Sequence, residues 1–536
     1  MKNIIIYFIG HGNIYTSEGE KCNKPSFLDW LVQHEEKNTV HMFYHLDHAV
    51  ANLCKMIELD DRELRKLWED KRLYVRGLNC NYTLSYVPGK MFSIDKGAGI
   101  GKKYMIFGNM GQYMDNKVKE CATANGIIEY PLQEAHKVAV EVVEAITEIT
   151  GTEPNNLASP IRAYQKAVLE PLNLPTDSNV PMEVGKLAYA CCKGGWTEAL
   201  SQGQWDIVYD WDRNSSYPSD MLDLVDTRWG EWEECTGNIN NVPDNAMGFY
   251  NCEVNITADF HPILYIDKNN KSFTPTGKWT TPLTLDEVRF IREWSLGTVQ
   301  ILDGWTFYPV GHPSHPLRNC TKRLYKYRQE HNGSIKGSVA KKILVASYGK
   351  FLEVQHINKK DMFGPMVNTV WAAQIETRTR LEVARFALEH GIVPLHIAVD
   401  GLVADRPILK ESSDKIGEWK LSAEAPAMIV GSGVVALQGK VKEGDFSLDY
   451  DWIRQEIEKE PFAQWIEMEN DSVITVGKAV MGCKNLGAVE RGTRSIILNG
   501  DNKRFYVQEP ESFGQMIGKH YRSTAWDISI LEGIKA

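Results

Sequence analysis

The sequence predicts a multidomain protein that combines α/β and α+β domains. Its 536 residues correspond to roughly three or four domains at about 150 residues each. Hydrophobic residues make up 43% and charged residues 24% of the chain, which is ordinary for folded domains and excludes disorder, collagen-like repeats and a coiled coil. A strand–helix pattern fills residues 1–60, whereas strands dominate beyond Tyr209.

The N-terminal part has the pattern of an α/β unit. Ile4–Ile9 and Thr39–Tyr44 have the apolar character of buried strands, and Ala49–Leu59 carries apolar residues at helical spacing. Ala135–Thr150 is predicted to form a second helix with a valine-rich apolar face. Prolines between residues 151 and 185 then predict a linker to the next domain.

Helices and a hairpin are predicted in the second half of the chain. Thr284 and Glu287 have the spacing of a capping box at the start of a helix over Leu283–Leu296. A short turn at residues 331–333 should let the helices on either side fold back as an antiparallel pair. The other predicted elements are that pair, Asn319–Glu330 and Ser338–Tyr348, a long helix Trp371–His390, and a strand pair around Pro394–Val403.

The cellular location and the state of the cysteines are predicted from features that the sequence lacks. The apolar run Ile4–Ile9 is too short for a secretory signal or a membrane span. The ten cysteines are dilute and none pair as C-x-x-C, so neither a disulfide framework nor a zinc site is predicted. We expect a cytoplasmic protein, in the host cell cytoplasm if it is viral.

A glycine-rich stretch at Lys96–Lys102 invites comparison with phosphate-binding loops. Its spacing fits neither the P-loop nor the dinucleotide pattern. Glycines supply positive φ angles in turns, so the stretch predicts a hairpin turn.

The first informative segment runs from Val208 to Met221. Asp212 ends a predicted strand, and Ser215, Ser216 and Tyr217 follow in a tight turn. A carboxylate at the end of a buried strand is costly unless a cation compensates it, and Mg²⁺ is a natural oxygen-bound cation. Taken alone, an ordinary cap or turn residue explains Asp212 equally well.

The second informative segment is strongly basic. Between Arg318 and Lys350 there are nine Lys and Arg residues and one acid, Glu330, in a chain of net charge −10. Lys341, Val345 and Tyr348 share one helix face, where a Lys above an aromatic ring could hold a triphosphate and a base. The alternative is a Lys stem lying along the edge of a core Tyr. The concentration of one sign favours a phosphate-facing surface.

The third segment, Leu395–Asp405, alternates as two apolar strands around Asp400 and Gly401. The Asp-Gly pair predicts a hairpin with an acid at its tip. Such hairpins are common, and this one gains meaning only from the other two segments.

In this order and spacing the three segments resemble the polymerase motifs of family B DNA polymerases, above all the protein-primed branch of phages and linear plasmids. The resemblance covers about residues 185–405 and includes Cys192–Gly195, where those enzymes carry Tyr-x-Gly-Gly, and the helix from Trp371 to Arg380. It implies a template-directed DNA polymerase for viral or mobile-element DNA replication. Template–primer DNA and dNTPs would be its partners, with a terminal protein primer as a further candidate, and the protein would act as a monomer.

The resemblance also assigns roles to individual residues. Asp212, Asp400 and the backbone carbonyl of Arg213 would hold two Mg²⁺ ions, with Mn²⁺ as a substitute, and Asp212, Asp400 and Lys341 would be the catalytic residues. Tyr217 would lie under the sugar of the incoming nucleotide. The nucleotide-binding set is Arg213, Ser215, Ser216, Tyr217, Arg328, Lys341 and Tyr348, and the DNA-binding set is Gly194, Gly195, Gly349 and Arg380.

Departures from the family pattern leave alternatives open. Ala398 stands where the third motif usually has its first Asp, and Val345 replaces an Asn. A catalytically impaired, polymerase-like DNA-binding protein is therefore the runner-up. A polymerase that uses RNA is the third reading, which Tyr217 disfavours.

The N-terminal residues resemble the proofreading exonuclease of the same family without its acids. The first strand has no Asp-x-Glu, Ala49 occupies the second-motif Asp position with Asp47 nearby, and Glu134 replaces the third-motif Asp. A metal-dependent exonuclease needs several converging carboxylates, so we expect little or no proofreading.

The predicted architecture is an N-terminal RNase H-like exonuclease-type domain followed by a right-handed polymerase of palm, fingers and thumb. Its predicted boundaries are 1–150 for the exonuclease-like domain, which we expect to be inactive, 151–185 for the linker, 186–310 and 352–445 for the palm, 311–351 for the fingers hairpin, and 446–536 for the thumb and C-terminal region.

Overall fold

The computed structural model describes most of the chain, and its contacts divide the chain into two compact units. Unit 1 comprises Met1–Pro171, Leu324–Ile343 and Met468–Arg494, and unit 2 comprises Leu172–Arg323, Leu344–Glu467 and Ser495–Ala536. The described residues are 2–10, 12–23, 26–34, 38–97, 105–114, 129–237, 242–357, 360–439, 449–463, 465–482, 485–497, 503–506 and 512–533.

Unit 1 is built on an eight-stranded sheet of order β3-β2-β1-β4-β8-β7-β6-β5. The central strands β1 (Asn3–Gly10), β4 (Thr39–Phe43) and β8 (Met105–Asn109) pair in parallel, and the other pairs are antiparallel. All residues of β4 and all but the first of β1 are buried, as apolar runs of this length predict. The remaining strands are β2 (Asn13–Thr16), β3 (Lys21–Cys22), β5 (Arg72–Arg76), β6 (Asn81–Val87) and β7 (Met91–Lys96).

The helices of unit 1 correct two sequence-based boundaries. The helix predicted at Ala49–Leu59 is α2 (Leu46–Met56), because His45 caps its N-terminus by accepting the amide of His48, and Glu58 beyond its end has a φ of 57°. The helix predicted at Ala135–Thr150 begins earlier, as α5 (Glu129–Thr150). The strands β7 and β8 are antiparallel neighbours, and the predicted turn between them falls on residues 98–104, outside the described residues.

A segment from late in the chain completes unit 1. Val476, at the start of α14 (Val476–Val480), belongs to the same buried cluster as β1 and β4. A Cβ on Gly477 would lie 2.7 Å from the ring of Trp68 in α3 (Asp61–Glu69), so only glycine allows this close packing. The other elements here are α1 (Phe27–Gln33), α6 (Pro160–Tyr164) and parts of β23 (Trp465–Val473) and β24 (Val489–Ile497).

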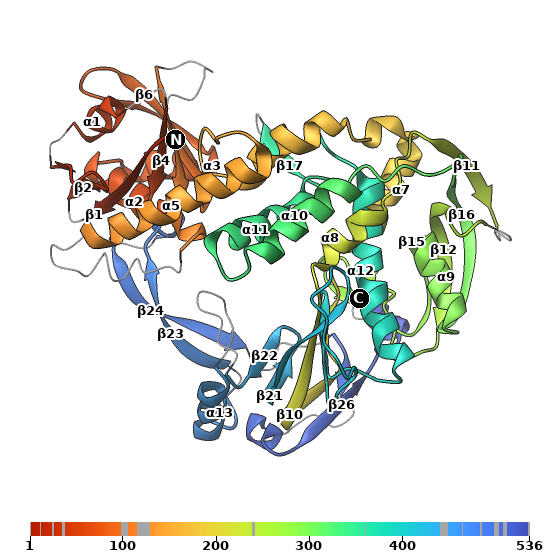
Figure 1. The fold of residues 1–536 in the computed structure, drawn as a ribbon. Helices are drawn as coiled ribbons and strands as arrows, with labels where there is room; N and C mark the ends of the chain where they lie inside the picture. The colour runs from red at the N-terminus through yellow and green to blue at the C-terminus, as the bar shows by residue number, and fades with distance from the viewer. Residues whose placement is uncertain are drawn as a thin grey trace. The chain divides into compact units, whose positions relative to one another are not determined.

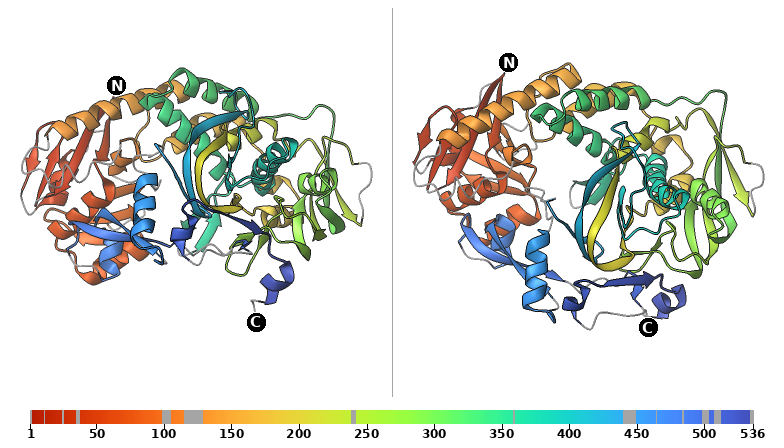
Figure 2. Two further views of the ribbon diagram at one scale, coloured as in Figure 1. Left: turned by 90° about the horizontal axis from the view of Figure 1, so that it is seen from below. Right: turned by 60° about the horizontal axis from the view of Figure 1, so that its bottom comes forward.

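The central sheet of unit 2 has the order β22-β21-β10-β20-β19-β9, with β26 also pairing β10. The long helix α12 (Thr369–Glu389) lies against this sheet, and the views in Figures 1 and 2 agree on this. Phe386 of α12 stacks on Trp419 at 4.0 Å between ring centroids. The strands are β9 (Thr197–Ala199), β10 (Ser201–Arg213), β19 (His396–Ala398), β20 (Gly401–Ala404), β21 (Trp419–Gly431), β22 (Val434–Leu437), β25 (Phe505–Tyr506) and β26 (His520–Thr524).

A second sheet of unit 2 has the order β11-β16-β12-β15 and carries the predicted capping box. Helix α9 (Leu285–Glu293) begins at Thr284, whose side chain accepts the amide of Glu287 while the Glu287 carboxylate accepts the amide of Thr284. The strands of this sheet are β11 (Gly230–Thr236), β12 (Met247–Ile256), β15 (Gly277–Thr284) and β16 (Gly297–Pro309), and further helices are α7 (Met182–Cys191), α8 (Ser216–Asp220), α13 (Tyr450–Lys459) and α15 (Ile528–Gly533).

The two helices predicted in the basic segment are present as α10 (Arg318–Glu330) and α11 (Ile335–Gly349). Their adjoining ends, Leu324–Ile343, belong to unit 1. There Lys336 Nζ lies 2.6 Å from Glu148 Oε1 and 3.4 Å from Glu144 Oε2 on α5, and Tyr327 donates to Glu148 Oε2 at 2.6 Å. These contacts anchor the turn between α10 and α11 on α5.

None of the helices in the described ranges is both long enough and apolar enough to cross a membrane. The finer division into exonuclease-like, palm, fingers and thumb segments stays a prediction, as does the RNase H-like character of the N-terminal part.

Candidate functional site

The central sheet of unit 2 brings the backbones of the two predicted metal-binding acids together: Asp212 lies on β10, and Asp400 lies in the turn before the neighbouring strand β20. Asp212 of β10 pairs with Gly401 of β20, and the Arg213 amide donates to the backbone oxygen of Asp400 at 3.0 Å. Both acids are half-buried. Residues far apart in the sequence therefore meet at one end of the sheet.

The hairpin turn differs from the prediction by one residue. Ala398 pairs with Gly401, so the two turn residues are Val399 and Asp400 rather than the Asp-Gly pair. Gly401 lies in the strand, where a Cβ would come within 2.5 Å of Asp212 Oδ1. The glycine thus makes room for the Asp212 carboxylate instead of supplying a turn conformation.

Val399, at the tip of this hairpin, has a strained backbone. Its φ of 59° is rare for a β-branched residue, and such conformations persist only where neighbours enforce them. Its amide donates to the Trp196 backbone oxygen at 2.7 Å. A Cβ on Gly195 would lie 2.9 Å from Val399 Cγ1, so the glycine pair Gly194–Gly195 packs directly on the tip that carries Asp400.

Asp212 and Asp400 at this end of the sheet are oxygen donors of the kind that Mg²⁺ prefers. Within the described ranges, no group of three or more His, Cys, Asp or Glu side chains forms a ready-made metal site. Mg²⁺ commonly uses only one or two carboxylates and completes its shell with water and substrate phosphates. The pair Asp212 and Asp400 fits that pattern.

One residue at this site was not predicted from the sequence. Ser422 of β21 donates its hydroxyl to Asp212 Oδ2 and so orients the carboxylate. A single serine in a strand of mixed composition carries no sequence pattern that could have identified it.

The Arg213 side chain is turned into the protein. Its guanidinium pairs with Asp220 at 3.0 Å and donates to the Gly417 backbone oxygen at 3.1 Å. Burial raises the pKa of Asp220, against the opposing effect of Arg213. A role for Arg213 at a metal would use its backbone carbonyl, as predicted from the sequence.

Ser215 and Ser216 lie where β10 passes into α8. Ser215, the N-cap of α8, has a left-handed backbone with φ of 48°. The Ser216 hydroxyl is buried and bonds to Arg213 and to Thr379, at 3.2 and 3.4 Å. The Ser216 side chain thus belongs to the internal network around Asp220.

Two residues of the predicted nucleotide pocket, Tyr217 and Tyr348, are in contact. Their ring centroids are 4.7 Å apart. Burial, together with the charges of Glu376 and Asp400, raises the pKa of Tyr217 to about 12. Burial and Glu376 also raise the pKa of Tyr348, so both phenols are protonated at neutral pH.

The Gly194–Gly195 turn is held from two sides by α12. Glu376 Oε2 accepts the Gly194 amide at 2.6 Å, and Arg380 donates to the Gly194 carbonyl oxygen at 2.7 Å. Arg380 is completely buried and pairs with the equally buried Glu287 at 3.1 Å. The predicted role of Arg380 in DNA binding would therefore have to act through the Gly194 backbone.

The other predicted residues lie along α10 and α11. Lys341 is exposed, and Arg328 is half-buried with its guanidinium 6.0 Å from the Tyr325 ring. Both belong to unit 1, and their contact with a triphosphate stays a prediction. Gly349, at the end of α11, is exposed and has open space where a Cβ would point.

The positions compared with exonuclease motifs are engaged in local contacts. Asp47 Oδ1 accepts from the Tyr86 hydroxyl at 2.6 Å and the Gly89 amide at 2.8 Å. Glu134 pairs with Lys137 at 2.7 Å, and Ala49 is buried. β1 carries no Asp or Glu. The absence of proofreading stays a prediction.

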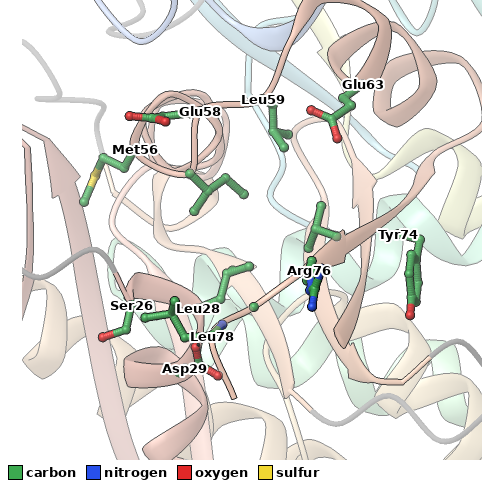
Figure 3. A pocket seen from close by; sticks show the side chains of 13 residues that line it. Ser26, Leu28, Asp29, Met56, Glu58, Leu59, Glu63, Tyr74, Arg76 and Leu78 are labelled. Carbon is green, nitrogen blue, oxygen red and sulfur yellow. Dashed lines mark hydrogen bonds between the residues drawn. The ribbon is translucent and has the colours of Figure 1, made fainter. Parts of the chain in front are cut away.

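Unit 1 also contains a cavity of about 830 Å³, lined by β5, α1 and the connection from α2 to α3 (Figure 3). Glu58, Glu63 and Arg76 lie around it. Asp29 in its wall is buried and already accepts from the Tyr82 hydroxyl at 2.6 Å and the Leu78 amide at 2.9 Å. No residue of the predicted polymerase site lines this cavity.

Comparisons with known proteins place the fold. No family profile matches the sequence, and no curated protein is significantly similar to it. Among solved structures, the chain matches Phi29 DNA polymerase complexed with primer-template DNA and incoming nucleotide, at TM-score 0.61 and 13% identity over 93% of this chain and 100% of that one. Two further Phi29 DNA polymerase complexes match at TM-score 0.58: one with primer-template DNA, at 14% identity over 92% and 100% of the two chains, and one with single-stranded DNA, at 15% over 91% and 96%.

The chain therefore has the fold of Phi29 DNA polymerase, a multidomain protein with mixed sheets and helices. The resemblance to protein-primed family B polymerases that the three motifs indicated is confirmed at the level of the fold.

Proposed function

We propose that this protein is a template-directed DNA polymerase that adds dNTPs to a primer 3′-hydroxyl in viral or mobile-element DNA replication. The observation that carries the proposal is the pairing of β10 with β20, which puts Asp212 beside the Asp400 turn. The similarity of the fold to Phi29 DNA polymerase, solved with primer-template DNA and nucleotide, supports it.

Asp212, Asp400 and the Arg213 carbonyl would hold two Mg²⁺ ions, or Mn²⁺ in their place. Bound divalent ions supply charge neutralisation at the reacting phosphate and a lowered pKa for the attacking hydroxyl. The protein's own contribution is mostly positioning. Ser422 orients the Asp212 carboxylate. Gly401 leaves the space that this carboxylate occupies.

The paired rings of Tyr217 and Tyr348 would form the pocket for the incoming nucleotide. Because the ring centroids are only 4.7 Å apart, the Tyr217 ring is backed by Tyr348 and can exclude a 2′-hydroxyl. Lys341 and Arg328 would neutralise the triphosphate, while Gly194, Gly195 and Gly349 would approach the DNA. A terminal protein primer is a further proposed partner, and we propose that the enzyme acts as a monomer.

Primer extension with Mg²⁺ and dNTPs tests the proposal. The wild type should extend a primer in template order, and Asp212→Asn and Asp400→Asn should each lower incorporation by at least about 10²-fold, because each removes a charge that would neutralise the reacting phosphate. Asp405→Asn is the matched control, since Asp405 lies exposed just beyond the end of β20. Equal incorporation by all four proteins would contradict the assignment of the two acids.

A catalytically impaired, polymerase-like DNA-binding protein is the second candidate. Ala398 favours it, because this exposed position at the hairpin tip offers no carboxylate. DNA binding by the wild type without any Mg²⁺- or Mn²⁺-dependent incorporation would establish this alternative.

The same reactions test proofreading. Asp47 is engaged with Tyr86 and Gly89, and Glu134 with Lys137, so we propose that a labelled 3′ end stays intact when the protein and Mg²⁺ are present without dNTPs. Rapid metal-dependent shortening would show that an exonuclease is present.

A further inference from the structure

Glu376 of α12 joins two parts of the candidate site that the sequence motifs treat separately. One carboxylate oxygen, Oε1, accepts the hydroxyl of Tyr348 from the end of α11. The other, Oε2, accepts the backbone amide of Gly194 at 2.6 Å. All three residues belong to unit 2. One side chain therefore holds both the nucleotide-pocket tyrosine and the glycine turn.

A carboxylate suits this arrangement because it accepts from both partners. The Gly194 amide can only donate, so an amide side chain that accepts from it would have to meet the Tyr348 hydroxyl as a donor, through its NH₂. Glu376 is 5% exposed, and Arg380, one turn further along α12, is paired with Glu287 instead. A buried carboxylate is costly unless its oxygens are hydrogen-bonded, so the two bonds explain how Glu376 is tolerated.

Each bond leads to a residue that would touch the nucleotide or the metal. On one side, Tyr348 packs on Tyr217 at 4.7 Å between ring centroids. On the other side, Gly194 is followed by Gly195, which packs against Val399 next to Asp400. A shift of Glu376 would therefore move the ring that backs Tyr217 and the turn that supports the hairpin tip.

We propose that Glu376 is a positioning residue that sets the selectivity of the nucleotide pocket for deoxyribonucleotides. The proposal rests on the polymerase function proposed above. Tyr217 excludes a 2′-hydroxyl only while its ring is held in place, and Tyr348 holds it only while its own hydroxyl is fixed by Glu376. Loss of that bond gives the Tyr348 and Tyr217 rings room to yield to a ribose.

Single-nucleotide insertion with dNTP and rNTP tests this on the wild type, Glu376→Gln, Tyr348→Phe and the double variant. Glu376→Gln keeps the shape but removes the charge, so both charge-assisted hydrogen bonds are lost and the NH₂ can meet the Tyr348 oxygen only as a donor. Loss of a hydrogen bond to a charged group changes an equilibrium constant by about tenfold or more. We expect KM for dNTP to rise and the preference for dNTP over rNTP to fall by about this factor, with a smaller change in kcat.

The double variant tests whether Glu376 acts on selectivity through Tyr348. If Glu376 acts through the Tyr348 hydroxyl, then the double variant should lose little more selectivity than either single variant. Glu382→Gln is the matched control, because Glu382 lies on the same helix but is partly exposed and pairs with Arg385. It should leave KM and selectivity unchanged.

Four outcomes would overturn the proposal. Unchanged selectivity in Glu376→Gln, or additive effects with Tyr348→Phe, would each do so while leaving the polymerase function intact. A lower melting temperature and kcat with unchanged KM and selectivity would show that Glu376 only stabilises the fold. A wild type that incorporates nothing would overturn the polymerase function and this inference with it.

Discussion

A glycine at position 401 of β20 makes room for the Asp212 carboxylate of the neighbouring strand β10. The Asp212 side chain occupies the space that any other residue at 401 would fill, with Oδ1 2.5 Å from the position of a Cβ. Ser422 holds the other oxygen from β21. The orientation of Asp212 therefore depends on Gly401 of β20, which has no side chain, and on the Ser422 hydroxyl of β21.

Gly401→Ala should displace the Asp212 carboxylate. The added methyl group cannot move away, since it is fixed to a strand that is paired on both sides, and overpacking of this kind costs about 1–3 kcal/mol. We expect primer extension to fall by about tenfold or more, while affinity for primer–template DNA, measured by fluorescence anisotropy, changes little.

Gly533→Ala controls for the loss of a glycine as such, because a Cβ at position 533 meets nothing within 4 Å. It should leave extension unchanged. Full activity of Gly401→Ala would show that the reaction does not depend on this orientation of Asp212.

Asp212, Tyr217, Tyr348 and Asp400 could be found from the sequence because each lies in a short motif with characteristic neighbours. In the structure Asp212 lies beside the Asp400 turn and Tyr217 beside Tyr348, while their roles stay predictions. Ser422 and Glu376 could not be found in this way. Their importance comes from partners on other elements, which only the folded chain brings together.

At the scale of elements, helices and strands were predicted well where one local sequence pattern determines them. The capping box at Thr284 marks the N-terminus of α9, and the apolar run Ile4–Ile9 lies within β1. Prediction was wrong by one residue at the Val399–Asp400 turn, because Gly401 is needed in the strand by Asp212. The membership of 468–494 in unit 1 depends on packing against α3 and the β1–β4 core, which has no local signature.

Strand β4 carries a buried histidine that should make unit 1 sensitive to acid. Burial, together with the nearby His34, lowers the pKa of His41 to about 4. Tyr7 lies at 3.1 Å from His41 Nδ1, and His34 pairs with Glu20 at 2.5 Å. The unfolded chain binds a proton at His41 below about pH 6.5, whereas the folded chain does so only near pH 4.

Stability contributed by neutral His41 is therefore complete above about pH 6.5 and is lost as the pH falls toward 4. Between pH 7.5 and 5.0 the loss is about 2 kcal/mol. We expect the opening free energy of β1 and β4, measured by hydrogen exchange, to fall by about this much more in the wild type than in His41→Gln. The exposed His312 supplies the control His312→Gln, and an identical pH dependence in wild type and His41→Gln would contradict the assignment.

At the scale of the whole molecule, a net charge of −10 is compatible with DNA binding because the charge is segregated. Ion pairs, however, neutralise part of the positive charge of the basic segment from Arg318 to Lys350. Arg318 pairs with Asp223, Lys336 with Glu144 and Glu148, and Lys350 with Glu353. Lys322, Arg323, Lys326 and Lys341 are the exposed cations of α10 and α11, and of these Lys326 pairs with Glu330 at 3.6 Å.

The salt dependence of DNA binding should reflect these exposed cations rather than the summed charge. Each cation that contacts a phosphate releases a counterion, and its removal lowers the slope of log K against log salt by about 1. Lys322→Gln with Arg323→Gln should therefore reduce the slope by about 2 and weaken binding to all sequences alike. Lys278→Gln is the control, because Lys278 lies on β15 and pairs with Glu253. An unchanged slope in the double variant would place the DNA-binding surface elsewhere than on α10, and the basic segment would then serve mainly to hold its own turn on α5.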